Sequence, residues 1–246
     1  MSEQPLDISV VAPAYNEFEN VEPLVEAIIK ALRATGRTFE VIIVDDQSTD
    51  ETLPRLRCQS RLHPELRVFT QRPRSGQTAA LASGFRQARG KYVATLDADL
   101  QNDPGEIPRM IEYLENDECD MVNGWRQKRN DNWVRRISSK FANGIRNWLS
   151  GETIHDSACS LKVYRSECLK NIKFFNGLHR FMPTLVKLEG YRVIEIPVNH
   201  RPRYAGTAKY GVWNRALRAL RDLFAIRWMK SRMIRCEVAE VLDESG

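Results

Sequence analysis

Two aspartates placed two positions apart, Asp97 and Asp99, are the residues of this sequence with the clearest capacity for chemistry. On an extended segment, residues i and i+2 share a face, so both carboxylates can reach one cation. Mg²⁺ and Mn²⁺ take a few carboxylate oxygens and leave other positions to water and phosphate. Gln101 offers a further oxygen two residues later. We therefore predict a site for Mg²⁺ or Mn²⁺ at Asp97, Asp99 and Gln101.

A single Asp-x-Asp triplet also occurs in ordinary turns, so its place in the fold decides its meaning. The carboxyl ends of parallel strands meet at one edge of a sheet, and open α/β sheets bind ligands there. Acidic or polar residues follow three strand-like runs: Ala14–Glu17 after Ile8–Ala12, Asp45 and Asp46 after Phe39–Val44, and Asp97 and Asp99 after Tyr92–Leu96. Their convergence predicts a binding site.

The first 125 residues alternate between strand-like and helix-like segments. Phe39–Val44 is a mainly apolar, β-branched run without polar alternation, which is typical of a parallel strand buried on both faces. We predict an α/β fold with a Rossmann-like, mostly parallel central sheet and helices on both faces. Its predicted strands are Ile8–Ala12, Phe39–Val44, Arg67–Thr70 and Tyr92–Leu96, and its predicted helices are Val21–Leu32, Thr49–Leu62 and Gln77–Ala88.

The second half of the chain mixes both kinds of element and contains no repeat or flexible linker. We expect one domain over residues 1–210, and a basic amphipathic C-terminal helix with its tail over residues 211–246. The expected elements are a strand beginning at Met121, a helix over Trp133–Leu149, strands over Ser160–Tyr164 and Tyr191–Val198, a helix over Pro183–Leu188, and a helix over Val212–Arg235.

Bulk composition fits a folded enzyme-sized body, since the chain has 246 residues of which 42% are hydrophobic. No apolar run approaches the roughly 18 to 20 residues of a membrane span, and the N-terminal residues do not resemble a secretory signal, so we expect a cytoplasmic location. The five cysteines are odd in number and never spaced as CxxC, so we expect reduced thiols without disulfides or a zinc site.

Phosphate binding must use something other than a glycine-rich loop, because the sequence has neither GxGxxG after the first strand nor a P-loop motif. A metal ion and arginines are the remaining means of holding a diphosphate. The net charge is only +5, but arginines concentrate in residues 125–146 and 201–235. These segments are either phosphate-binding surfaces or solvated basic faces. Nucleic acid is not expected as a partner, because three acidic strand ends would repel it.

Three segments resemble successive signatures of the family 2 inverting glycosyltransferases of GT-A fold. The similarity is greatest to the branch of dolichyl-phosphate mannose synthases and undecaprenyl-phosphate sugar transferases, and it runs from about residue 6 to residue 230. The segments are Val10–Glu17 (VVAPAYNE), Val44–Thr52 (VDDQSTDET) and Asp97–Pro104 (DADLQNDP).

The resemblance implies roles for particular positions. Asp97, Asp99 and Arg126 would be the catalytic residues. Arg135 and Ser139 would receive an acceptor phosphate; they lie four residues apart on an expected helix and so share a face. Where the family usually has serine in its late diphosphate loop, this chain has Thr207. The implied donor-nucleotide residues are Pro13, Tyr15, Glu17, Val44, Asp46, Ala98, Arg203 and Lys209.

The activity that the resemblance implies is transfer of a sugar, with inversion, from a UDP- or GDP-hexose to undecaprenyl or dolichyl phosphate. The product would be a lipid-linked sugar for cell-envelope glycans or glycoconjugates. Because a phosphate oxygen is already anionic near neutral pH, it needs no strong base, and His155–Asp156 is interpreted as structural. The alternative is a saccharide or protein hydroxyl acceptor. Processive hydroxyl-directed members have Gln-x-x-Arg-Trp, whereas Phe224 precedes Arg227–Trp228 at that spacing.

The basic C-terminal segment raises the question of membrane contact, since many relatives carry transmembrane helices there. Apolar residues recur three or four apart among arginines, so this helix can lie peripherally on the cytoplasmic face of a membrane. Two alternatives stay open: the apolar face packs on the sheet, or a separate membrane protein supplies the anchor. The apolar positions are Trp213, Leu217, Leu220, Phe224 and Trp228.

Overall fold

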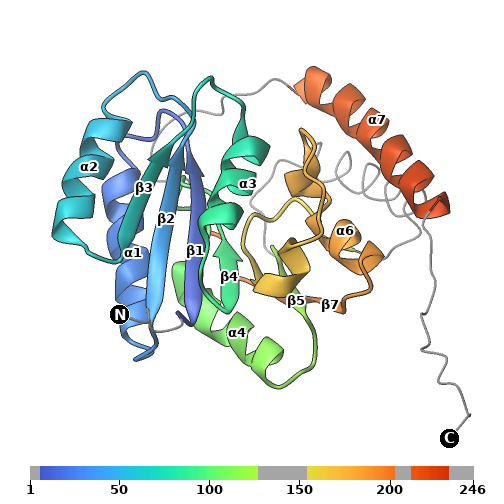
Figure 1. Cartoon of the computed structure of the whole chain (residues 1–246), viewed down its shortest axis with the longest axis horizontal. Coiled ribbons are helices and arrows are strands. Elements are labelled where there is room, and N and C mark those ends of the chain that lie inside the picture. Colours follow the sequence, from blue (N-terminus) through green and yellow to red (C-terminus); the bar gives the residue numbers. More distant parts are fainter. Residues whose placement is uncertain (1–5, 127–153, 203–211, 233–246) are drawn as a thin grey trace, which may run out of the picture.

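The computed structural model describes residues 6–126, 154–202 and 212–232, with the side chains of 212–220 excepted. A seven-stranded sheet with the order β3-β2-β1-β4-β6-β5-β7 forms its centre (Figure 1). The strands are β1 Ile8–Ala14, β2 Phe39–Asp45, β3 Leu66–Thr70, β4 Tyr92–Thr95, β5 Met121–Trp125, β6 Lys162–Arg165 and β7 Val193–Pro197.

All but one of these strands run in parallel. β6 is antiparallel to both of its neighbours, with Thr95 of β4 opposite Lys162 and Asn123 of β5 on the other side of the same lysine. The remaining pairs, including β5 with β7, are parallel. The carboxyl ends of the six parallel strands therefore lie at one edge of the sheet, together with the amino end of β6.

Helices cover both faces because the central strands are apolar on both. Successive side chains of a strand point to opposite faces, so in β1 Val10 joins the core on one face and Val11 the core on the other, as do Ile43 and Ile42 of β2. This is why the run Phe39–Val44 shows no polar alternation.

The helices α1 and α2 lie to one side of the strands and α3 crosses in front of them (Figure 1). The core under α1 and α4 is separate from the core under α3, η2, η3, α6 and α7. The helices are α1 Val21–Arg33, α2 Thr52–Leu62, α3 Gln77–Gln87, α4 Ile107–Glu115, α6 Met182–Leu188 and α7 Val212–Ser231, with 3₁₀ turns η1 Pro104–Glu106, η2 Ser166–Leu169 and η3 Leu178–Arg180.

Helix α3 approaches β1 closely at Gly84. A Cβ atom at this position would lie 2.3 Å from Cγ1 of Val11, so only glycine fits without movement. The close approach seats the start of α3, and with it Gln77, beside the end of β4.

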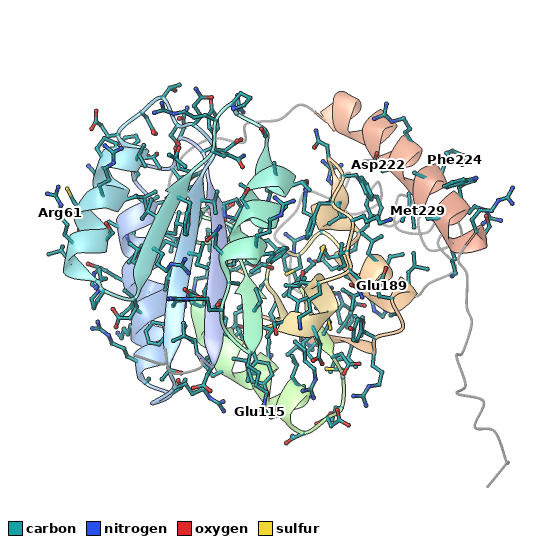
Figure 2. The ribbon with its side chains drawn as sticks, in the orientation of Figure 1. Arg61, Glu115, Glu189, Asp222, Phe224 and Met229 are labelled. Carbon is teal, nitrogen blue, oxygen red and sulfur yellow. The ribbon has the colours of Figure 1, made fainter. Side chains whose placement is uncertain are left out.

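Helix α7 packs its described part on the face that carries α6. Leu223 and Ile226 are buried there, whereas Phe224 and Trp228 are 58% and 64% exposed. Figure 2 shows Asp222 on the side of α7 toward the body and Phe224 on the outer side. Among the described residues, no helix combines the length and low charge needed to cross a bilayer.

The sequence predictions match the sheet well. The four N-terminal strands and the helices beginning at Val21 and Gln77 are confirmed within one or two residues, but α2 begins at Thr52 rather than Thr49. Helix α4 was not predicted, and neither was the antiparallel direction of β6. The expected helix over Trp133–Leu149 lies outside the described residues. A helix occupies Val212–Ser231, but its amphipathic character and the boundary at residue 210 stay predictions.

Candidate functional site

The loops that follow β1 and β2 are joined to each other at the carboxyl edge of the sheet. The Asn16 backbone N–H donates to Ser48 Oγ at 2.9 Å, and the Thr49 N–H donates to Asn16 Oδ1 at 2.8 Å. Asn16 and Gln47 both have positive φ, at 52° and 57°. Such backbone is uncommon for non-glycine residues, and the hydrogen bonds between the loops hold it.

Asp46 joins this pair of loops to the segment after β3. Its carboxylate, 3% exposed, accepts hydrogen bonds from Gln71 Nε2 at 2.5 Å and from the backbone N–H groups of Ser75 and Gly76 at 2.8 and 2.9 Å. Asp46 therefore orders the loop of residues 71–76. The structure thus gives this predicted donor-binding residue a loop-positioning contact as well.

Tyr15 lies directly under that loop. The guanidinium of Arg74 stacks 3.7 Å from the centre of the Tyr15 ring, and Arg74 Nε lies 3.7 Å from Asp46 Oδ2. Glu17 accepts from Asn20 Nδ2 at 2.6 Å. The predicted donor residues of β1 and β2 are thus brought together, since Pro13 is also opposite Val44 in the parallel register.

Asp97 and Asp99 follow β4 at the centre of the same edge. Asp97 Oδ1 accepts from Gln77 Nε2 of α3 at 2.7 Å, and Asp99 Oδ1 accepts from the Gln101 N–H at 3.2 Å. Burial raises the pKa of the Asp97 carboxyl, and the negative charge of Asp99 raises it further. A buried carboxyl group whose ionisation is opposed by a neighbouring carboxylate favours a cation beside it.

The donor set fits a magnesium- or manganese-type ion. The described residues contain no cluster of three or more His, Cys, Asp or Glu side chains that could enclose a metal. Mg²⁺ is commonly bound by one or two carboxylates together with water and substrate phosphate, so two aspartates are a sufficient protein contribution. Gln101, predicted as a third ligand, is half-buried on the same loop.

The loop predicted to bind the metal is braced by the segment after β7. The Arg201 N–H donates to the Gln101 carbonyl at 2.8 Å, and the Arg201 guanidinium pairs with Asp103 at 2.5 Å. Asn102 forms an isolated bridge with His200. The chain entering the predicted late loop at Arg203 is therefore anchored beside Asp99 and Gln101.

Arg126, at the end of β5, forms a nearly buried bidentate pair with Asp156. Its Nε and one terminal nitrogen lie 2.7 and 2.9 Å from the two carboxylate oxygens. Burial opposes ionisation of Asp156, but the hydrogen bonds and charge of Arg126 prevail and lower its pKa. The interpretation of Asp156 as structural stays a prediction, and its contact with Arg126 was not predicted.

Glu195 of β7 holds the loop that carries Asp156. Its Oε1 accepts from Asn123 Nδ2 at 3.0 Å and from the Asp156 N–H at 3.1 Å. Its Oε2 accepts from the His155 N–H at 2.7 Å and contacts His155 Nδ1 at 3.0 Å. The His155 ring stacks on Trp125 at 4.5 Å between ring centroids. A chain of contacts thus runs from Glu195 through Asp156 to Arg126.

Sequence reasoning missed four side chains at this edge: Gln77, Arg74, Lys162 and Glu195. Only Lys162 carried a local signal, because it is a charged residue in the otherwise uncharged segment Ala158–Tyr164. Of the other predicted site residues, Ala98 is buried after β4, whereas Arg135, Ser139, Arg203 and Lys209 lie outside the described residues.

The sheet order, the single antiparallel strand and the carboxylates after β4 define an α/β protein of GT-A type. The chain belongs to glycosyl transferase family 2, whose family model matches residues 9–173. Solved structures similar to it share the fold. They include a mannosyltransferase from Pyrobaculum calidifontis in complex with GDP-Man and Mn²⁺, with a TM-score of 0.65 and 21% identity over 91% of this chain and 64% of that one.

A second solved structure is glucosyl-3-phosphoglycerate synthase from Mycobacterium tuberculosis with Mn²⁺, UDP and phosphoglyceric acid. Its TM-score is 0.70 at 18% identity, over 94% of this chain and 80% of that one. At these identities the likeness shows the fold alone.

Curated relatives are more similar in sequence. A dodecaprenyl-phosphate galacturonate synthase from Rhizobium johnstonii is 40% identical over 227 residues, which are 91% of this chain and 67% of that protein. An undecaprenyl-phosphate 4-deoxy-4-formamido-L-arabinose transferase from Edwardsiella ictaluri is 38% identical over 83% of this chain. The chain spans 67% and 63% of the lengths of these two relatives.

Proposed function

We propose that this chain transfers a sugar, with inversion, from a UDP- or GDP-linked donor to a polyprenyl phosphate such as undecaprenyl or dolichyl phosphate. The observation that carries the proposal is the grouping, at one sheet edge, of Asp97 and Asp99 with Asp46, Tyr15 and the paired Arg126. The curated relatives described above, whose names specify polyprenyl phosphate, support the choice of acceptor.

The donor side of the site follows from the chain's own contacts. Tyr15 supplies a flat surface for a nucleobase, while Asp46 holds the loop of residues 71–76 around it. Asp97 and Asp99, with Gln101, would hold Mg²⁺ or Mn²⁺, which when bound neutralises charge on a leaving diphosphate. Arg126, kept in place by its ion pair with Asp156, would present its guanidinium group at the same edge.

The acceptor side needs alignment rather than a base, because a phosphate monoester oxygen is already anionic near neutral pH. We assign phosphate binding to Arg135 and Ser139, and closure over the diphosphate to Arg203 and Lys209. The lipid would approach from a membrane surface at its cytoplasmic face, with the exposed Phe224 on the contacting side of α7. A separate anchoring protein is the alternative means of membrane contact.

The test is a transfer assay with purified protein, a short-chain polyprenyl phosphate, Mn²⁺ or Mg²⁺, and a panel of UDP- and GDP-sugars. We expect organic-soluble sugar product that disappears with EDTA and falls at least about a hundredfold in Asp99→Asn. Glu112→Gln removes an exposed carboxylate from α4 and serves as the matched control.

Two results would contradict the proposal. Donor hydrolysis or transfer to saccharide hydroxyls without lipid product would favour the hydroxyl-acceptor alternative. Full activity of Asp99→Asn in the presence of EDTA would remove the metal site. Binding of the nucleotide sugar by calorimetry, with and without Mn²⁺, separates loss of donor binding from loss of transfer.

A further inference from the structure

A cavity of about 100 Å³ lies beside Asp97, on the sheet face covered by α3 and α6. It is larger than the roughly 30 Å³ that one water occupies in the liquid, so it can hold a small chemical group. Its wall combines apolar and polar side chains from α3, from β4 and its end, from β6 and the loop before it, and from η3 and α6. They include Gln77, Leu81, Asp97, Lys162, His179 and Arg180.

Lys162 is the most unusual residue of this wall. It is 2% exposed and lies on β6 between β4 and β5, on the same face as Tyr164. Its Nζ donates to the Ser157 carbonyl at 3.2 Å. Among the residues that the structure describes, this is its one hydrogen bond, and no carboxylate lies within 4.0 Å of Nζ.

Burying an ammonium group with only one hydrogen bond is unfavourable, because the ion loses its hydration free energy. A paired charge or further hydrogen bonds are needed to offset that loss. Neither nearby carboxylate is its ion-pair partner: Asp156 is occupied by both nitrogens of Arg126, and Asp97 accepts from Gln77. Burial accordingly lowers the pKa of Lys162. The fold therefore keeps a buried lysine that forms no direct ion pair with a described carboxylate, although the charges of Asp156 and Asp97 act on it from beyond 4.0 Å.

The rest of the wall makes the cavity basic. Arg180 and His179 face it from η3, where His179 Nδ1 and Thr78 Oγ1 are 2.8 Å apart. Asp97 is the only carboxylate among the lining residues, and in the proposed function its charge serves a metal ion. Lys162 and Arg180 are then the cationic side chains of the wall on the side of the predicted metal site.

We propose that this cavity binds an anionic group of a substrate, with Lys162 as its main counter-charge. The proposal rests on the proposed function and adds a binding residue and a substrate chemistry to it. Two sources supply such a group beside Asp97: the phosphate of the acceptor, or a carboxylate carried by the transferred sugar. The chemistry of recognition is the same, namely charge-assisted hydrogen bonds from a buried ammonium.

Lys162→Met tests the proposal, because methionine is unbranched, of similar length and uncharged. A lysine that serves the fold would make the variant less stable, whereas one kept for a ligand leaves the melting temperature unchanged or raises it. We expect the latter, together with at least about a tenfold loss of affinity for the substrate that carries the anion. Lys170→Met, at an exposed lysine after η2, is the control.

Three probes identify the source by calorimetry, with no need for turnover: a short-chain polyprenyl phosphate, a UDP-linked uronic acid and the matching neutral UDP-hexose. Weaker binding of the polyprenyl phosphate alone assigns the cavity to the acceptor. Weaker binding of the UDP-uronate, with the neutral sugar unchanged, assigns it to the sugar. Because binding is measured directly, either result stands even if no lipid product forms in the transfer assay.

Unchanged affinity of Lys162→Met for all three probes would overturn the proposal, as would a lower melting temperature with unchanged binding. If Lys162→Met does not fold, a second variant, Leu81→Phe, tests the proposal. It fills the cavity from α3 and leaves the lysine in place. The same selective loss of affinity is expected from it, and unchanged affinity for every probe would again reject an anion site.

Discussion

At the scale of single residues, three aspartates at the carboxyl edge of the sheet lie in three different environments. Asp46 accepts three hydrogen bonds and orders a loop, Asp156 neutralises an arginine, and Asp97 carries a raised pKa beside a second carboxylate. Only the last has an excess of negative charge that a cation would relieve. The environments, rather than the residue type, separate the proposed metal ligand from the other two acids.

Glu195 is predicted to act on Arg126 through the loop that carries Asp156. In Glu195→Gln one carboxylate oxygen becomes an NH₂ group that faces N–H donors, so at least one hydrogen bond is lost and a repulsive contact replaces it. We expect a loss of about 1 to 3 kcal/mol in the free energy of unfolding. Transfer activity should fall mainly in kcat, because Arg126 loses its fixed position.

Denaturant unfolding and steady-state kinetics check this expectation. Glu189→Gln is the matched control, since Glu189 is exposed at the end of α6 (Figure 2). A Glu195→Gln variant that is less stable but has an unchanged kcat would show that the contact serves the fold without reaching Arg126.

At the scale of elements, the fit of α3 against β1 depends on the missing side chain of Gly84. Gly84→Ala places a methyl group 2.3 Å from Val11 Cγ1, which forces the helix outward. Overpacking of this kind costs about 1 to 3 kcal/mol, although alanine favours the helix by somewhat less. Thermal unfolding should therefore show a lower melting temperature, whereas Gln87→Ala, exposed on the same helix, should not.

The displacement of α3 has a functional consequence that separates it from simple instability. Gln77 at the start of this helix donates to Asp97, so an outward movement should weaken Mn²⁺ binding at temperatures where the variant is still folded. Unchanged stability and Mn²⁺ affinity in Gly84→Ala would mean that Val11 rotates away at no cost.

The described part of α7 presents two faces with separable roles. Phe224 and Trp228 lie four positions apart on the exposed side, among the exposed basic residues Arg221, Arg227 and Lys230. If this face contacts a membrane, the double change Phe224→Ser and Trp228→Ser should reduce sedimentation with anionic vesicles at least about tenfold and leave the melting temperature within about 2 °C.

Leu223→Ala is the complementary variant, because Leu223 is buried against the body. It should lower the free energy of unfolding by about 2 to 4 kcal/mol without changing vesicle binding of the folded protein. Vesicle binding that survives loss of both aromatic residues would favour a separate anchoring protein.

The elements that could be predicted are those whose periodicity is local. β1 and β2 are mainly apolar runs, and α1 repeats its apolar positions at helical spacing, so each was found from its own residues. The direction of β6 was not predictable, because the run Lys162–Arg165 is the same whether its neighbours are parallel or antiparallel. The local sequence pattern also predicted that Asp97 and Asp99 lie at the carboxyl edge. It did not predict Gln77 or Glu195 there, because their contacts are with residues distant in sequence.

At the scale of the whole molecule, the two edges of the sheet are built differently. The carboxyl edge has carboxylates beside a cavity. The opposite edge, at the amino ends of the parallel strands (the amino edge), has a hydrogen-bonded network around Glu40. Glu40 is 2% exposed and accepts from Ser9 Oγ at 2.7 Å, from Arg67 at 2.6 Å and from the Arg89 N–H at 2.8 Å. The proposed substrate chemistry thus lies at one edge, and the network around Glu40 lies at the other.

Glu40 predicts a particular dependence of stability on pH. Burial opposes its ionisation, but the hydrogen bonds from Ser9, Arg67 and Arg89 prevail and hold its pKa below the ordinary 4.5. A carboxyl whose pKa is depressed by folding stabilises the protein above the pKa of the unfolded chain, and the contribution is lost as pH falls through the folded pKa. Glu40→Gln should therefore cost roughly 3 kcal/mol at neutral pH and progressively less below about pH 4.5.

Urea unfolding of wild type and Glu40→Gln between about pH 7 and about pH 3 measures this difference directly. Glu26→Gln, an exposed acid on α1, should show a small difference throughout. A gap for Glu40→Gln that stays constant with pH would mean that the two arginines are stabilised by the shape of the side chain alone. A gap that closes on acidification would locate charge-dependent stability at the amino edge, away from the proposed catalytic residues.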